Sequence, residues 1–186
     1  MNPRSPLAPY AEALLSWHRD ITQRSPPRGR LLGQGAELRR ASSLGEVALL
    51  AGFHSLRTRL REAGFALEPR AEPKLALVAA LLAKVREHRP GAPSLATRLG
   101  SPVPKTERSV LSPLRFRQLL EREEAAELLR PLSTVIALLD AQLDVLELAE
   151  AAFGWGLERR KRWAYDYYDA CPEPGQSKKS KKGEAA

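Results

Sequence analysis

The sequence has almost none of the residues on which catalysis, metal binding or a disulfide scaffold would depend. Its 186 residues include a single cysteine, Cys171, and three histidines. One cysteine cannot form an intramolecular disulfide, which excludes a disulfide-built secreted scaffold and fits a reducing cytoplasm. The histidines His18, His54 and His88 lie far apart and have no metal-ligand spacing. We therefore expect no metal and no cofactor.

Motifs typical of enzymes and membrane proteins are also missing. Gly33-Gln34-Gly35 has neither the rest of a phosphate-binding loop nor a preceding strand. The run that contains Glu121, Glu123 and Glu124 is typical of a solvated helix face. No stretch approaches the roughly 20 apolar residues of a membrane span, and no apolar core of a secretory signal follows Met1. These absences predict a cytoplasmic protein that is not an enzyme and does not contact a membrane.

Signals for β-strands are nearly absent as well. The sequence has few runs of β-branched residues, no alternating segments, and no Asn-Gly or Asp-Gly turn. No repeat period indicates a helical solenoid. Apolar residues instead recur at helical spacing along most of the chain, which is long enough to bury a core. We predict an all-α fold, a compact helical bundle of about eight or nine helices in two halves.

Capping residues indicate where the first helices begin and end. The first helix is expected over residues 8–22, and the second is expected to end near Arg40. Ser43 and Glu46, three residues apart ahead of an apolar run, fit a capping box. Gly52 is expected to interrupt the helix that follows.

The centre of the chain carries the strongest helix signal. Gly64 suits a left-handed C-terminal cap, and Pro73 suits the first position of the next helix. Residues 75–83 are apolar on every face, which predicts a central, buried helix. A short helical turn is expected at residues 94–99, and Gly100 ends it.

Further signals define the second part of the chain. Ser112 is expected to cap a helix, and Pro131 is expected to kink or restart the next one. Asp144 and Glu147 fit a second capping box, and a last helix is expected over residues 158–169.

Composition divides the chain into four expected segments. A lead-in of residues 1–7 precedes an N-terminal helical half, residues 8–105. The C-terminal helical half covers residues 106–170 and is followed by a disordered basic tail, residues 171–186. The tail contributes a charge of +2, so the folded part retains most of the net charge of +8.

Arginine dominates what the sequence does contain. It supplies 22 of the 30 basic residues, and the sequence pI is about 10.0. A guanidinium matches phosphate geometry better than an ammonium group does, although codon usage can also produce this ratio. The basic residues gather in short clusters at the ends of apolar helical stretches: Arg39 and Arg40; Arg115 and Arg117; Arg159, Arg160, Lys161 and Arg162. Such clusters without a catalytic constellation favour binding of a polyanion.

Helical geometry limits which of these arginines can share a face. Arg115 and Arg117 lie about 200° apart at 100° per residue, so one can bind phosphate while the other pairs within the protein. Arg115 and Arg122 do share a face, and Asp166 is a possible partner of Arg162 at i+4. A solvated or salt-bridged surface role stays open for each arginine.

Aromatic residues in the last helix allow two interpretations. Trp163, Tyr165, Tyr167 and Tyr168 could form a base-stacking platform. Their helical spacing favours Trp163 and Tyr167 as core anchors, with the other two tyrosines at the boundary.

Several motifs occur in an order that resembles one family. Over roughly residues 8–170, the sequence resembles the CasB family, the small subunit of the type I-E CRISPR surveillance complex Cascade. The motifs are Leu38-Arg39-Arg40-Ala41, Phe53-His54, Val85-Arg86-Glu87-His88, Ser94-Leu95-Ala96, Leu114-Arg115-Phe116-Arg117-Gln118-Leu119-Leu120, Leu129–Leu139, Val145-Leu146-Glu147-Leu148-Ala149, Arg162-Trp163-Ala164 and Tyr167-Tyr168.

The resemblance implies two helical halves, no catalytic activity and a role in antiviral defence. It implies that two copies pack head to tail and contact the large and backbone subunits of Cascade. The subunit would hold the guide RNA–target DNA heteroduplex and stabilise the displaced strand of the R-loop. The matching nucleic-acid-binding residues are Arg39, Arg40, Arg115, Arg117, Arg130, Arg159, Arg160, Lys161 and Arg162. The lysine-rich tail is not part of the family pattern.

The sequence is also compatible with two other functions. The subunit could be a pure scaffold whose arginines form salt bridges to acidic neighbours. It could also be a free-standing helical nucleic-acid-binding protein.

Overall fold

A computed structural model describes residues 6–22, 29–104, 106 and 108–172. The predicted lead-in and the basic tail lie largely outside these residues. The described chain forms ten α-helices, which confirms the predicted all-α fold. They are α1 (Ala11–Thr22), α2 (Gly29–Arg40), α3 (Leu44–Ala48), α4 (Ala51–Glu62), α5 (Glu72–Leu82), α6 (Leu95–Gly100), α7 (Pro113–Leu120), α8 (Ala125–Leu138), α9 (Val145–Phe153) and α10 (Leu157–Ala170). Two 3-10 helices, Ala8–Tyr10 and Pro69–Ala71, precede α1 and α5.

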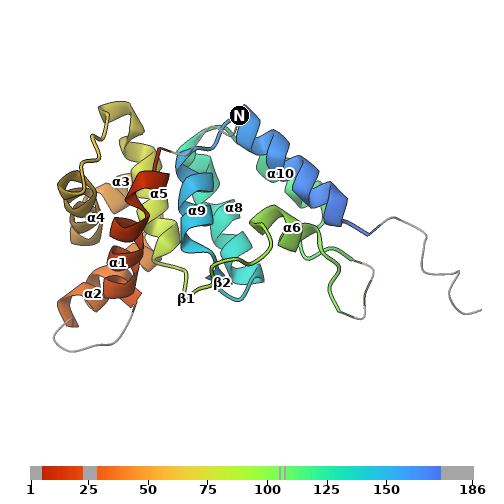
Figure 1. Cartoon of the computed structure of the whole chain (residues 1–186), viewed down its shortest axis with the longest axis horizontal. Helices are drawn as coiled ribbons and strands as arrows, with labels where there is room; N and C mark the ends of the chain where they lie inside the picture. The colour runs from red at the N-terminus through yellow and green to blue at the C-terminus, as the bar shows by residue number, and fades with distance from the viewer. Residues whose placement is uncertain (1–5, 23–28, 105, 107, 173–186) are drawn as a thin grey trace, which may run out of the picture.

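Helix α5 is the centre of the molecule, as its uniformly apolar sequence predicts. All residues from Leu75 to Leu82 are buried. In Figure 1, α1–α4 lie at one end of the molecule, α6 and α10 lie at the other, and α8 and α9 lie between them. Helix α5 packs against α3 and α4 on one side and against α8 and α9 on the other. Each fully buried Leu or Val side chain contributes roughly 1.5–3 kcal/mol to such packing.

One hydrophobic core runs through both parts of the chain. The residues of this core extend from Leu7 to Tyr167. None of the described helices is long and apolar enough to span a membrane. Helix α6 precedes residue 105, yet it packs against α10 near the C-terminus. The division into halves of residues 8–105 and 106–170 stays a prediction.

The predicted caps are present with two changes. Ser43 Oγ accepts a hydrogen bond from the backbone N–H of Glu46 at 3.2 Å. The Glu46 carboxylate accepts in turn from the backbone and side chain of Ser42, at 2.8 and 3.1 Å, instead of reaching the N–H of Ser43. These bonds lower the pKa of Glu46, the backbone contact most. Ser112 occupies the N-cap of α7, but its hydroxyl makes no capping hydrogen bond.

Gly52 does not interrupt a helix, which corrects the sequence prediction. The chain breaks at Leu49 and Leu50, between α3 and α4, and Gly52 lies buried inside α4. A Cβ atom at Gly52 would lie 2.7 Å from Cδ1 of Leu38, so the glycine permits α4 to approach α2 closely. Gly64, by contrast, has a φ of +94° and ends α4 as predicted.

Proline 131 does not restart the helix in which it lies. Helix α8 is one element from Ala125 to Leu138, with Pro131 inside it. The prediction that a new helix begins at Pro131 is therefore wrong.

A short strand pair departs from helical structure in a way that the sequence did not predict. In β1 (Glu87–His88) and β2 (Gln142–Leu143), Glu87 pairs with Gln142 and His88 with Leu143 in parallel. Strands of two residues are too short to leave a periodic signal. The pair ties the segment after α5 to the turn after α8.

Candidate nucleic-acid interface

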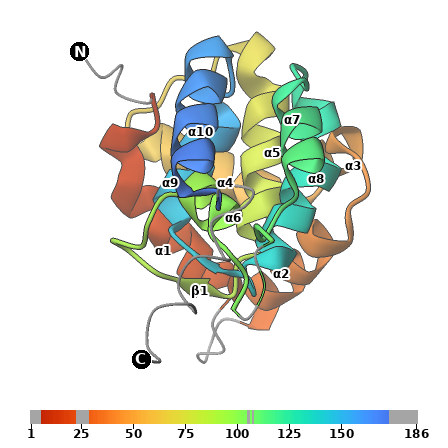
Figure 2. The same ribbon diagram turned by 90° about the vertical axis from the view of Figure 1, so that its right-hand side faces the viewer.

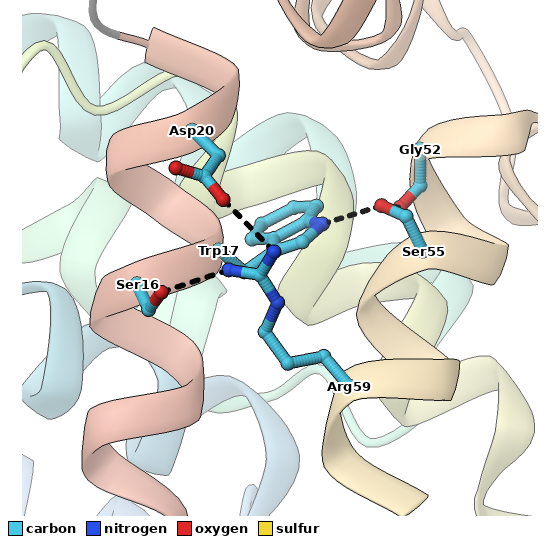
Figure 3. Close-up of polar contacts among 6 residues, drawn as sticks. All are labelled: Ser16, Trp17, Asp20, Gly52, Ser55 and Arg59. Atoms are coloured by element: carbon cyan, nitrogen blue, oxygen red, sulfur yellow. Dashed lines mark hydrogen bonds and ion pairs between the residues drawn. The ribbon is translucent and has the colours of Figure 1, made fainter. Parts of the chain in front are cut away.

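Some arginines are used inside the protein. Arg59 of α4 donates to Ser16 Oγ at 2.9 Å and to Asp20 Oδ2 at 2.8 Å, both on α1 (Figure 3). Beside it, Trp17 Nε1 donates to Ser55 Oγ at 2.8 Å. The Arg59 guanidinium therefore holds α4 against α1, and we do not assign it to a nucleic-acid surface.

Arg160 has a similar internal role in the second part of the chain. Its guanidinium donates to the carbonyl oxygen of Leu120 at 3.1 Å and to Glu123 at 2.8 Å. Only 19% of its side chain is exposed. Trp155 Nε1 donates to the carbonyl oxygen of Arg122 at 2.9 Å in the same loop. These contacts hold the α7–α8 loop against α10, so most of Arg160's hydrogen-bonding capacity is directed inward.

The other members of the α10 cluster differ from one another. Arg159 is half-buried, and its pKa is lowered mainly by burial. Lys161 is exposed and pairs with Glu158 at 2.9 Å, and Arg162 is exposed. Asp166, the expected partner of Arg162, accepts a hydrogen bond from Ser94 Oγ at 2.9 Å. The cluster is therefore not one uniform basic face.

Arg115 and Arg117 on α7 are both exposed. The sequence geometry allows one of them to bind phosphate while the other pairs within the protein. Among the described residues, however, neither guanidinium group makes a hydrogen bond or an ion pair. Both guanidinium groups are thus free to bind an external anion.

A groove about 320 Å³ in volume lies between α7 and α8, which run beside each other in Figure 2. We call it the α7–α8 groove. Arg115 of α7 and Arg122 in the loop after α7 both line it, as their spacing of seven residues predicts. Its lining residues are Leu111, Arg115, Gln118, Leu119, Arg122, Pro131, Thr134 and Val135. Arg130 is exposed on α8, four residues before Thr134 and on the same helix face.

A second, larger hollow of about 890 Å³ lies where α2, α5 and α8 end. We call it the α5–α8 cleft. It is lined by Thr22, Arg39, Ala83, Lys84, Val85, Arg86, Ser133, Ile136, Ala137, Asp140 and Ala141. Three of these residues, Arg39, Lys84 and Arg86, are cations. Arg40 is exposed beside Arg39 at the end of α2 and does not line the cleft.

Sequence reasoning missed Lys84 and Arg86 as site residues. They lie about 45 residues from Arg39 along the chain and belong to no arginine cluster. In the sequence, Arg86 stands out only as part of the family motif Val85-Arg86-Glu87-His88. What brings them to Arg39 is the packing of α2 against α5, which no local pattern reveals.

The two hollows flank the same helix. Ser133, Ile136 and Ala137 of α8 face the cleft, whereas Pro131, Thr134 and Val135 face the groove. The fold thereby places Arg39, Arg115 and Arg130, from three distant segments, around α8. Residues of the Arg159–Arg162 cluster line neither hollow.

The aromatic residues of α10 act as core anchors. Trp163 and Tyr167 are buried, which confirms that prediction, and the Tyr167 ring stacks on Phe116 at 3.8 Å. The exposed fractions of Tyr165 and Tyr168 are 69% and 52%. A stacking platform that includes Trp163 is therefore wrong.

Glu147 of α9 is a half-buried carboxylate that lines neither hollow. It accepts from the backbone N–H of Leu95 at 2.7 Å, so it joins α9 to the start of α6 and does not close the predicted capping box. Its pKa is raised to about 7, first by burial and then by the charges of Asp144 and Asp166. Among the described residues, no group of His, Cys, Asp or Glu could hold a metal ion.

Glu147 makes stability depend on pH. Its pKa rises from an ordinary 4.5 to about 7 on folding, so the folded state holds the proton more tightly. This stabilisation is complete below pH 4.5 and is lost as the pH rises through 7. We expect the free energy of unfolding to fall by on the order of 2 kcal/mol across that window.

Urea denaturation at pH 5 and pH 8 checks this prediction against Glu147→Gln, which keeps an acceptor but cannot titrate. The lowered pKa of buried His18 acts in the opposite direction and is common to both proteins. The difference between the two stability curves therefore isolates Glu147. If the free energy of unfolding changed equally with pH in the wild type and in Glu147→Gln, the raised pKa of Glu147 would be contradicted.

A comparison with models of known protein families identifies one family. The family model for the CRISPR-associated protein Cse2 matches residues 34–168. The sequence matches none of the curated proteins.

Two solved structures share the fold. A chain in the crystal structure of E. coli Cascade bound to a PAM-containing double-stranded DNA target has a TM-score of 0.61 and 19% identity, covering 84% of this chain and 94% of that chain. CasB from Thermus thermophilus has a TM-score of 0.60 and 22% identity, covering 91% of this chain and 100% of that chain. As the sequence motifs indicate, the chain belongs to the family of the CRISPR-associated protein Cse2, also called CasB.

Proposed function

We propose that the protein is a non-catalytic, cytoplasmic subunit of a Cascade-type CRISPR surveillance complex and binds the nucleic-acid backbone. The observation that carries this proposal is the arrangement of unpaired cations around α8. Arg115 and Arg122 line one flank of the helix, Arg130 lies on it, and Arg39 lines the other flank. Family membership and the shared fold with a Cascade chain support it.

The mechanism is neutralisation of phosphates without reading of the base sequence. In such complexes, base pairing with a guide RNA reads the sequence. The RNA–DNA heteroduplex is about as stable as the DNA duplex that it replaces, so protein contacts with the backbone favour the exchange. Exposed guanidinium groups spread over two flanks of one helix suit an extended strand better than a compact ligand. The partners would be guide RNA, target DNA with its displaced strand, the backbone and large subunits, and a second copy of the chain.

A scaffold function is the alternative that specific contacts favour. Arg59 and Arg160 are both engaged with acidic residues or carbonyl groups of the protein itself. If the exposed arginines found acidic partners on neighbouring subunits in the same way, the protein would only brace the assembly.

Binding of single-stranded DNA by the full chain separates the two functions. We expect a native gel to show a retarded complex at low salt that weakens steeply at moderate salt. The logarithm of the affinity should fall with the logarithm of salt by about 0.7 for each phosphate contacted. Absence of a complex at low salt would favour the scaffold.

A further inference from the structure

The α5–α8 cleft has two kinds of surface. Arg39, Lys84 and Arg86 supply positive charge. The aliphatic lining residues are Ala83, Val85, Ile136, Ala137 and Ala141, of which Ala137 is exposed and the other four are buried. Its volume of about 890 Å³ lies within the range of roughly 300–1,000 Å³ that small-molecule sites occupy. A phosphate alone needs the cations and has no use for the aliphatic surface. The cleft therefore suits a ligand with an anionic end and a flat, less polar end.

Hydrogen bonds within the protein hold the cations in place. Lys84 Nζ donates to the carbonyl oxygen of Arg39 at 2.7 Å, and Arg39 donates to the carbonyl oxygen of Ala83 at 3.4 Å. Arg86 donates to the carbonyl oxygen of Asp140 at 2.9 Å. An ammonium has three donors and a guanidinium has five, so each cation retains donors for a ligand. Burial and the charge of Arg39 lower the pKa of Lys84, and a bound anion would offset both effects.

The turn at one edge of the cleft has an unusual backbone. Asp140 and Ala141 have φ values of +56° and +55°, a left-handed conformation that costs a non-glycine residue free energy. The N–H groups of Arg86 and Glu87 hold the turn by donating to the carbonyl oxygen of Ala141 at 2.9 and 3.2 Å. Asp140 is the only acidic residue among the described lining residues, so this edge repels phosphate and can accept hydrogen bonds from a base.

We propose that the α5–α8 cleft receives one unstacked nucleotide of a single-stranded nucleic acid. Its phosphate binds Arg39 and Lys84, and its base lies over Ala137 toward Asp140. This inference rests on the proposed function, because the nucleotide would belong to the strand that the basic residues around α8 hold. The inference adds a contact to a base, made by the α8 residues that line the cleft. This contact does not depend on the α7–α8 groove.

Two single-stranded 12-mers test the inference with the full chain. One carries thymine at every position, and the other has the same backbone without bases. We expect the wild-type protein to bind the thymine strand at least about fivefold more tightly, which corresponds to roughly 40 Å² of base surface buried against apolar groups of the cleft. Equal affinities would overturn the inference and leave the proposed function intact. Failure to bind either strand would overturn both.

A pair of alanine substitutions on α8 locates the base contact. Ala137 is exposed and lines the cleft, so Ala137→Leu fills the space of the base, offers no aromatic face for stacking and leaves every cation in place. Ala126→Leu makes the same change at an exposed position of α8 that does not line the cleft. We expect Ala137→Leu to abolish the preference for the thymine strand and Ala126→Leu to retain it. A preference that survives in Ala137→Leu would overturn the inference.

A fluorescent base gives a second readout that needs no variant. No aromatic side chain is among the described lining residues of the cleft, so a 2-aminopurine base that leaves the stack there meets aliphatic groups. We expect its fluorescence to rise on binding. Quenched or unchanged fluorescence at every position of the strand would contradict an unstacked base in this cleft.

Discussion

Gly100→Ala is expected to lower the free energy of unfolding by about 3 kcal/mol, at the upper end of what overpacking costs. Gly100 is the last residue of α6 and is buried against α10. A Cβ atom there would overlap the carbonyl oxygen of Tyr167 and lie 3.0 Å from its carbonyl carbon. Backbone atoms cannot turn away as a side chain can, so α6 would have to separate from α10.

The separation would also disturb the ring contacts of α10. Tyr167 stacks on Phe116, and its hydroxyl donates to the carbonyl oxygen of Leu111 at 2.5 Å. Urea denaturation measures the loss, with Gly33→Ala as the matched control. Gly33 lies in α2, and a Cβ there meets no atom within 4 Å, so this change should stabilise the protein by about 0.5–1 kcal/mol. A Gly100→Ala protein as stable as the wild type would contradict the packing of α6 on α10.

Removing three arginines in or beside the α7–α8 groove is expected to weaken binding of single-stranded DNA about 100-fold at 0.1 M salt. The variant combines Arg115→Ala, Arg122→Ala and Arg130→Ala, three exposed residues in or beside the α7–α8 groove. Each phosphate contact contributes about 0.7 to the salt exponent, which corresponds to roughly fivefold in affinity at 0.1 M. Because the side chains are exposed, the stability of the fold should change by less than about 0.5 kcal/mol.

The control variant removes the same charge elsewhere. Arg57→Ala and Arg61→Ala lie on the exposed face of α4, and Arg70→Ala removes an exposed partner of Glu68. Helix α4 lies at the end of the molecule opposite α6 and α10 (Figure 1). If binding depended only on net charge, both triple variants would weaken it equally. We expect the control to weaken it less than about fivefold.

Local signals predicted most of the helices because each depends on residues close in the sequence. The uniformly apolar run of α5, the hydroxyl of Ser43 and the left-handed Gly64 all act within a few residues. The sequence predicts that Gly52 breaks a helix and that Gly100 ends one, and only the second prediction is confirmed. Both glycines also permit close approach to another helix, at Leu38 and at Tyr167, and that role depends on tertiary packing.

The candidate site was predictable only in part for the same reason. Arg115 and Arg122 line a common groove, as their spacing of seven residues predicts, although α7 ends at Leu120 and Arg122 lies in the loop that follows. The inward role of Arg160 depends on the loop that follows α7, and the meeting of Arg39 with Lys84 depends on α2 and α5. The β1–β2 pair and the left-handed Asp140 and Ala141 leave no sequence signal.

The salt dependence of single-stranded DNA binding by the wild type and the two triple variants tests the central claim most directly. Fluorescence anisotropy of the full chain between about 0.05 and 0.3 M salt gives the slope of log affinity against log salt for each protein. Loss of Arg115, Arg122 and Arg130 should make the slope shallower by about 2, since each lost contact removes about 0.7. The Arg57, Arg61 and Arg70 variant should retain the wild-type slope. Equal slopes for all three folded proteins would contradict phosphate binding by the residues around α8.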